Sequence, residues 1–418
     1  MDASGWRLAF VRFSRRLWAR LAAFAAGAVA VALLAGAVGS WPSSVLPVDL
    51  GEDAVQTLLQ ILASSMLAVT TFSLTVMVSA YASAASVSTP RATQLLVRDQ
   101  TSQHALATFL GAFVYSIVGI AALSTGYYGE DGRIVLYAGT LVVIAIIVVT
   151  LLRWIQHLVD FGRMSDVLDR VEAAACEAAT ASARRPHLGG VAPVAVPPQA
   201  WAVPAEDAGV VTHVDMAALS AAADGSAVRI HVLVRAGAAV ARGEDLARVE
   251  GPRADDAEAE VRRAFMIERH RTYDQDPRLG LVALGEIGSR ALSPSTNDPG
   301  TAIEALNAIQ RVLTAALTTE PEAEPSHPRV HVPAVSFADL VEDGVRPVAR
   351  DGAPLVEVGL RVQRVIGGLL RIAPPAEAEV LREASRRAER RAVAGLADPG
   401  DEDLVARAAA RARGEGDA

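Results

Sequence analysis

Two sets of side chains have types and spacings that could support chemistry. The first lies in the stretch from Ala54 to Ser88, which contains no charged residue. Hydroxyl side chains recur along it at steps of four and seven, which places them on one face of a helix. We call this set the hydroxyl face, and its members are Ser64, Thr71, Thr75, Ser79 and Ser83. A charge-free helix with such a face can enter a membrane while facing something other than lipid.

The hydroxyl face has two interpretations. If several copies assemble, it would line a permeation path with uncharged polar groups, and acids at the outer mouth would concentrate cations. Those acids are Asp49, Glu52, Asp53, Glu130 and Asp131. Alternatively, the small residues let helices approach closely while their hydroxyls bond back to the chain. No carboxylate or arginine lies between Val55 and Val87, which disfavours a proton-coupled transporter.

The second set lies in the stretch RTYDQDPRLGLVALGEIGSRALSPSTNDPGTAIEALNAI, from Arg271 to Ile309. We call seven of its polar residues the motif: Arg271, Asp274, Asp276, Glu286, Arg290, Asn297 and Asp298. They would either converge on a small-molecule or ion site at a helix N-terminus, or form a capped, salt-bridged helix hairpin that orders an oligomer interface. The commonness of caps and surface ion pairs favours the hairpin.

Composition excludes several classes of function. All 39 basic residues are arginine, which rules out Schiff-base lysines, lysine-attached cofactors and a phosphate-binding P-loop. The single cysteine, Cys176, can build neither a disulfide nor a thiolate metal cage within one chain. A net charge of −8 gives no support for nucleic-acid binding. His327 and His331 flank Pro328 and are a poor metal pair. We expect no catalytic residue, cofactor or metal.

Apolar segments at about 20–38, 54–86, 105–125 and 134–153 predict four transmembrane helices in residues 1–156. The first also resembles a signal peptide, but its length favours an uncleaved helix. Arginines cluster before the first segment, between the second and third, and after the fourth, whereas the other two loops are acidic. This positive-inside pattern places both termini in the cytoplasm and the protein in the inner membrane.

The remainder predicts a cytoplasmic α+β part. A helical linker spans 157–185, and a small β module with alternating Val and Ile residues spans 186–251. The spacing of its glycines resembles the barrel-sandwich modules of lipoyl and biotinyl carriers, although the lysine that carriers need is absent. Helical periodicity covers 252–395, including an amphipathic helix at about 255–269, and a helical or disordered tail covers 396–418. Within this region we expect helices at 277–292 and 299–317, and Asp298-Pro299 predicts the start of the second.

Taken together, the four apolar segments, the SVSTPR sequence that ends the second one, the β module and the ALSPSTNDPGTAIEAL stretch resemble the bacterial membrane protein family called domain of unknown function 2254. The resemblance covers nearly the whole chain. It implies an architecture, and no activity.

These observations predict a homo-oligomeric, channel-like protein for small cations, lined by the second transmembrane helix and gated or assembled by the cytoplasmic part. The alternative is a membrane-anchored scaffold or sensor whose soluble domain binds a ligand or partner without transport. In both cases the lipid bilayer is a partner, nucleic acid is not, and the protein is not an enzyme.

Overall fold

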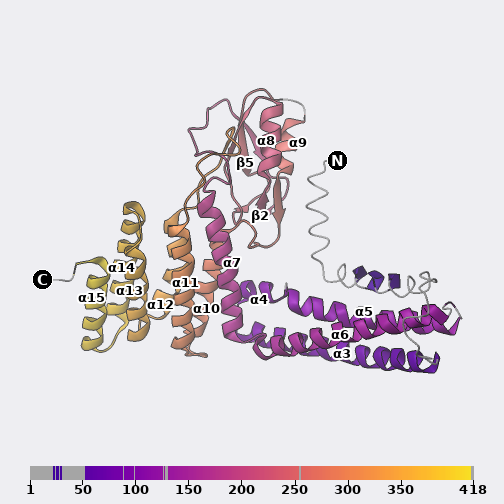
Figure 1. Cartoon of the computed structure of the whole chain (residues 1–418). Helices are drawn as coiled ribbons and strands as arrows, with labels where there is room; N and C mark the ends of the chain where they lie inside the picture. Colours follow the sequence, from indigo (N-terminus) through magenta and orange to yellow (C-terminus); the bar gives the residue numbers. More distant parts are fainter. Residues whose placement is uncertain are drawn as a thin grey trace. The chain divides into compact units, whose positions relative to one another are not determined.

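The computed structural model describes residues 22–23, 25–27, 29–30, 52–87, 89–97, 99–125, 127, 130–253 and 256–415 (Figure 1). These residues form two compact units. Unit 1 comprises the described residues of Met1–Val87 and Leu96–Asp166. Unit 2 comprises those of Ser88–Leu95 and Val167–Ala418. The short segment between two apolar helices therefore belongs to unit 2, although unit 1 both precedes and follows it in sequence.

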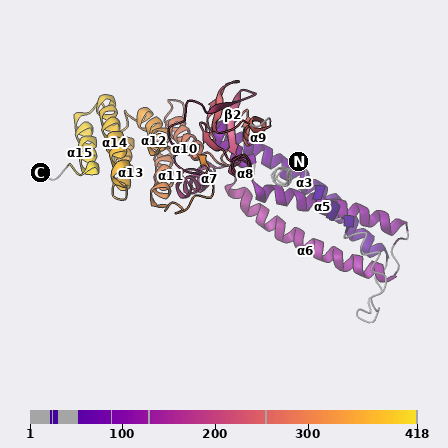
Figure 2. The ribbon, with the colours of Figure 1, turned by 90° about the horizontal axis from the view of Figure 1, so that it is seen from above.

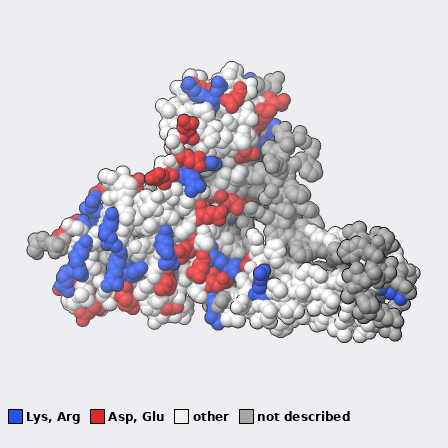
Figure 3. Space-filling model, viewed as in Figure 1, with Lys and Arg blue, Asp and Glu red and all other residues white. Residues whose placement is uncertain are grey.

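Unit 1 is built from three long helices that lie side by side in Figures 1 and 2: α3 (Glu52–Val87), α5 (Gln100–Ser124) and α6 (Glu130–Asp160). Each contains a span long and apolar enough to cross a membrane, at Ala54–Ala84, Gln100–Ser124 and Gly132–Val159. Where they are not grey, their surfaces are almost free of charge (Figure 3). The predicted second, third and fourth segments are thus long apolar helices. The first, at 20–38, falls largely outside the described residues, so the count of four stays a prediction.

Two clusters of apolar side chains hold the unit 1 helices together. One joins Leu59 of α3, Leu123 of α5 and Leu136 of α6. The other joins Met66, Phe109 and Trp154, from the same three helices. The first cluster places the starts of α3 and α6 at one end of the unit, beside the end of α5. A buried hydrogen bond also fixes how α6 packs on α3, since Trp154 donates its indole N–H to Ser73 at 3.0 Å.

Unit 2 consists mainly of helices. They are α4 (Pro90–Val97, whose last two residues fall in unit 1), α7 (Met164–Arg184, whose first three residues fall in unit 1), α10 (Pro277–Ala291), α11 (Pro299–Thr318), α12 (Phe337–Asp351), α13 (Val356–Leu370), α14 (Pro375–Gly395) and α15 (Pro399–Arg413). From α10 to α15 they pack in succession (Figures 1 and 2). Three of them begin with an Asp-Pro pair whose aspartate caps the helix: α10, α11 and α15. The helix start predicted at Asp298-Pro299 is therefore confirmed.

The β module of unit 2 contains two sheets. The strands are β1 (Trp201–Pro204), β2 (Gly209–Val214), β3 (Arg229–Val232), β4 (Ala239–Val240), β5 (Asp245–Glu250), β6 (Phe265–Glu268) and β7 (Val330–His331). The first sheet has the order β1-β5-β3-β7, with β7 parallel to β3, and the second has the order β4-β2-β6. Side chains such as Val211, Ile230 and Leu246 fill their common core.

The module differs from the sequence-based expectation in two respects. A helix, α8 (Met216–Gly225), lies between β2 and β3, and the barrel-sandwich likeness is not confirmed. The helix expected at 255–269 is shorter: α9 (Ala257–Arg263) ends before β6, which pairs antiparallel with β2. The physical reason is tertiary, because pairing with an exposed strand edge outweighs the helical preference of a few residues.

Candidate functional site

At the start of α10, the motif forms a buried ion pair. Asp276 is 1% exposed and accepts from the Arg271 guanidinium at 2.6 and 3.0 Å. It also caps the helix by accepting the backbone N–H groups of Arg278 and Leu279, at 3.1 and 3.2 Å. Gly237 is packed so closely here that a Cβ would lie 2.5 Å from a carboxylate oxygen of Asp276. Asp276 thus ties the β module to the helices of unit 2.

Tyr273 extends this cluster towards the segment that joins α3 to α5. Its ring is buried, and its hydroxyl donates to the backbone carbonyl of Arg91 at 3.1 Å. Burial raises the pKa of Tyr273 well above its usual value of 10, and the nearby carboxylate of Glu286 adds to the rise. The hydroxyl therefore stays protonated and keeps donating at all physiological pH values.

The side chain of Arg91 completes the connection, because its guanidinium pairs with the carboxylate of Glu286 on α10. Arg91 comes from the SVSTPR sequence and Glu286 from the stretch that begins at Arg271, so two motifs 195 residues apart meet here. We call Thr89–Val97, which contains α4, the connector. Within unit 2 the connector is held by a side-chain ion pair and by a hydrogen bond to its backbone.

An open groove of about 760 Å³ lies beside this contact. Its lining combines cations, carboxylates, hydroxyls and proline rings, and the residues are Thr89, Pro90, Arg91, Glu286, Ser289, Arg290, Leu292, Ser293, Pro294, Asp351 and Pro354. We call this the connector groove. Ser289 and Asp351 hydrogen-bond to each other in its wall. One carboxylate oxygen of Glu286 is buried and has no hydrogen-bond partner in the structure.

The structure separates the motif into three parts. Arg271 and Asp276 form the buried pair, whereas Glu286 and Arg290 line the connector groove. Asp298 caps α11 by accepting from the Thr301 N–H and hydroxyl at 3.0 and 2.6 Å, and these bonds lower the pKa of Asp298. Asn297 precedes it in the left-handed region with φ 46°. Asp274 is exposed and does not line the groove.

Several residues of this site were not identified from the sequence. Tyr273 lies inside the selected stretch but has an ordinary side chain for a core position. Arg235 is 9% exposed and donates to the carbonyls of Pro186 and Pro333, each at 2.7 Å. Burial lowers the pKa of Arg235 to about 10, although Asp276 opposes the shift. An arginine near a glycine turn has no sequence pattern that would predict a buried side chain donating to two backbone carbonyls.

In unit 1, all five residues of the hydroxyl face are exposed in the single chain. Three of the hydroxyls donate to carbonyls of their own helix: Ser64 to Gln60, Thr71 to Leu67, and Thr75 to Thr71, each at 3.0 Å. This arrangement satisfies the hydroxyls without water or a neighbouring helix. It is therefore compatible with a pore lining, a packing surface and a lipid-facing surface.

The acids expected at an outer mouth are partly described. Glu52 and Asp53 begin α3, and Glu130 and Asp131 begin α6, at the end of unit 1 where those helices meet. Asp49 lies outside the described residues. Across the part of the chain that the structure describes, no group of three or more histidine, cysteine, aspartate or glutamate side chains is placed to hold a metal ion.

Comparison with known proteins gives a family and no activity. The chain is 27% identical, over 356 residues, to uncharacterized proteins of Mycobacterium bovis and Mycobacterium tuberculosis. The alignments cover 77% of this chain and 65% of each relative, so the chain spans about two thirds of their length. No solved structure matches. Residues 14–367 match the family described as predicted membrane protein, and the chain therefore belongs to that family, DUF2254.

Proposed function

We propose that this membrane protein is a sensor in which unit 2 binds a small polar ligand and transmits the binding to the membrane helices through the connector. The carrying observation is the attachment of the connector to α10 by the Arg91–Glu286 pair and the Tyr273–Arg91 hydrogen bond. The proposal places unit 2 in the cytoplasm, as the arginine distribution of the loops favours.

The connector is suited to transmission because it is short. Helix α3 ends at Val87 and α5 begins at Gln100, so few residues separate the contact from either helix. An isolated helix of eight residues such as α4 is marginal in water and depends on its packing. A ligand that binds one arrangement of the connector better than another would shift its population, and the flanking helices would follow.

The connector groove supports a ligand that carries charges of both signs. Arg91 and Arg290 would hold an anionic group, and Glu286 and Asp351 a cationic one. The unpartnered oxygen of Glu286 would accept a hydrogen bond from such a ligand. Proline rings and Leu292 supply apolar contact. The ligand would touch the connector directly.

Replacement of Glu286 tests the proposal. In a Cys176→Ala background, Ala82→Cys places a thiol at an exposed position of α3, five residues before the helix ends. We expect Glu286→Gln to change its rate of labelling by a water-soluble reagent about two- to fivefold, the factor that corresponds to an ion pair worth about 0.5–1 kcal/mol. Glu342→Gln, which weakens ion pairs to Arg346 and Arg387 away from the connector, should leave the rate unchanged. Equal labelling rates in the Ala82→Cys protein and in its Glu286→Gln and Glu342→Gln variants would contradict coupling through the Arg91–Glu286 contact.

A second candidate function, a cation channel, is supported by the exposed hydroxyl face and by the acids at the starts of α3 and α6. It requires several copies to assemble around the hydroxyl face. In a planar bilayer, the purified protein would give discrete currents that Thr75→Phe abolishes. Leu74→Phe, at an exposed apolar position one residue away, serves as the control. Silence across voltages, or currents that both variants reduce equally, would contradict a pore lined by this face.

A further inference from the structure

A second groove of unit 2 lies between α13 and α15, remote in sequence from the connector. It has a volume of about 470 Å³. Four arginines line it, together with Gln310 of α11. Arg361 and Arg364 lie on α13, Arg371 is the C-cap residue of that helix, and Arg411 lies on α15. The first three follow at steps of three and seven, and because Arg371 keeps helical backbone angles they lie on one face. We call this the arginine groove.

The arginine groove contains no carboxylate. None of its lining residues is acidic, and its four arginines form no ion pair with any residue that the structure describes. Arg411 donates only to the backbone carbonyl of Arg407, at 3.3 Å. The Nε atom of Arg361 is buried and has no hydrogen-bond partner. The groove therefore combines uncompensated positive charge with at least one buried donor that lacks an acceptor.

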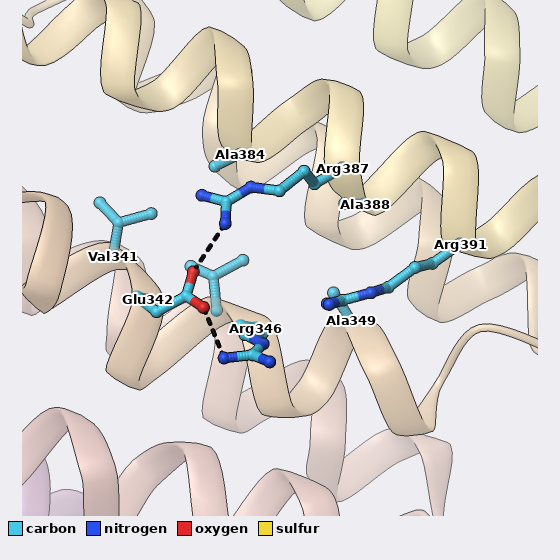
Figure 4. A pocket seen from close by; sticks show the side chains of 9 residues that line it. Val341, Glu342, Arg346, Ala349, Ala384, Arg387, Ala388 and Arg391 are labelled. Carbon is cyan, nitrogen blue, oxygen red and sulfur yellow. Dashed lines mark hydrogen bonds and ion pairs between the residues drawn. The ribbon is translucent and has the colours of Figure 1, made fainter.

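Another cleft of unit 2 differs from the arginine groove in its charge balance. Basic and acidic side chains lie together over the end of the unit formed by its last helices (Figure 3). In the cleft between α12 and α14, the carboxylate of Glu342 lies between Arg346 and Arg387, at 2.7 and 3.3 Å (Figure 4). That cleft has a volume of only about 20 Å³, which is room for water alone. The arginine groove is both larger and uncompensated.

The floor of the arginine groove is made of small residues. Gly367 faces Ala412, and a Cβ at Gly367 would lie 3.1 Å from that residue. The close approach of α13 and α15 leaves the long arginine side chains as walls. Beneath the floor, Gln363 is 1% exposed and bonded to Ser385 at 2.7 Å, which fixes the base of the groove. The guanidinium groups are thus presented from a rigid support.

We propose that the arginine groove binds an anion that carries two or more phosphate groups. Guanidinium groups form bidentate, charge-assisted bonds with phosphate oxygens, and several arginines in one concave site favour a ligand with several negative charges. No aromatic side chain lines the groove, so nothing there would stack on a nucleobase. Recognition therefore rests on the phosphates, which a soluble oligophosphate or a lipid headgroup would supply.

Calorimetric titration of the full chain in neutral-lipid nanodiscs with inorganic tripolyphosphate tests the site. We expect saturable binding to one site per chain that weakens as salt is added. Removing two arginines, with Arg364→Ala and Arg371→Ala, should lower the affinity about tenfold or more. The matched control is Arg382→Ala with Arg390→Ala on α14, which removes the same charge from arginines that pair with Glu379 and Glu383.

Two further experiments test whether the guanidinium shape is needed and whether the phosphate groups belong to a lipid or to a soluble ligand. Arg364→Lys with Arg371→Lys retains the charge but loses the planar fork, so its affinity should lie between those of the wild type and the alanine variant. In flotation assays, vesicles of phosphatidylcholine and cardiolipin that bind the protein, in competition with tripolyphosphate, would identify a lipid headgroup. Tripolyphosphate binding without vesicle binding would identify a soluble ligand. Absence of both, or equal loss of affinity in the α14 control, would overturn the proposal.

Discussion

At the scale of single residues, Asp276 joins the start of α10 to the β module of unit 2. It accepts four hydrogen bonds while almost completely buried: two from the Arg271 guanidinium and two from backbone N–H groups. It also faces the buried guanidinium of Arg235, whose charge it stabilises. Loss of this carboxylate would leave positive charge and helix donors without a partner.

We predict that Asp276→Ala lowers the free energy of unfolding of unit 2 by about 3–5 kcal/mol, the usual cost of removing one partner of a buried ion pair. Urea unfolding of the full chain in detergent, followed by the amide hydrogen exchange of α10 and the β module, measures this change. Asp274→Ala, at an exposed neighbouring position, should stay within about 0.5 kcal/mol of the wild type. A loss at position 276 no larger than at 274 would show that the cluster does not stabilise the fold.

His231 gives the β module a dependence on pH. Its ring is 3% exposed and stacks on His331 with 4.9 Å between centroids. Burial lowers the pKa of His231 below the usual 6.5, while Glu250 opposes the shift and His331 and Arg229 add to it. The unfolded chain binds this proton more readily, so the stabilisation is complete above pH 6.5 and is lost as the pH falls through that value.

We therefore predict that the unfolding temperature of the β module falls as the pH is lowered from about 8 to 5. His231→Phe preserves the stacked ring and removes the titrating group, so the fall should become smaller. His327→Gln, on a half-buried loop residue, should retain the wild-type dependence. A His231→Phe profile as steep as that of the wild type would exclude this residue as the cause.

At the scale of elements, the packing of α10 against α7 depends on Gly280. A Cβ at this position would overlap the side chain of Ala175. We predict that Gly280→Ala destabilises unit 2 by about 1–3 kcal/mol through overpacking. Gly225→Ala, at the end of α8 with open space around it, should instead be neutral or stabilising by up to about 1 kcal/mol. Urea unfolding compares the two variants, and equal effects would contradict close packing at Gly280.

Some helices of unit 2 could be predicted from local sequence patterns alone. Periodicity and Asp-Pro starts predicted helices at 277–292 and 299–317, and α10 and α11 end within one residue of those limits. Their signals are local, since capping and amphipathicity act within a few turns. The short strand β6 was not predicted, because its hydrogen-bond partner, β2, lies more than 50 residues away in sequence.

At the scale of the whole molecule, the candidate site combines residues that the sequence identified separately. Glu286 and Arg290 were selected as polar residues of one helix, whereas Arg91 was noted in the loop arginines that orient the membrane segments and in the SVSTPR sequence. Nothing in the local pattern around either helix indicates that Arg91 and Glu286 pair, because an ion pair across 195 residues depends on the tertiary fold. The sequence therefore identified three residues of the connector groove, Arg91, Glu286 and Arg290, and not their meeting.

Transmission from unit 2 to the membrane helices requires that the connector is bound to unit 2. Amide hydrogen exchange of residues 91–97 in the full chain in nanodiscs measures this binding, because an isolated eight-residue helix would not protect its own amides. We predict slow exchange in the wild type, accelerated by Glu286→Gln and by Tyr273→Phe and unaffected by Glu342→Gln. Exchange in the wild type as fast as in an unstructured peptide would show that the connector is free, and would contradict transmission through it.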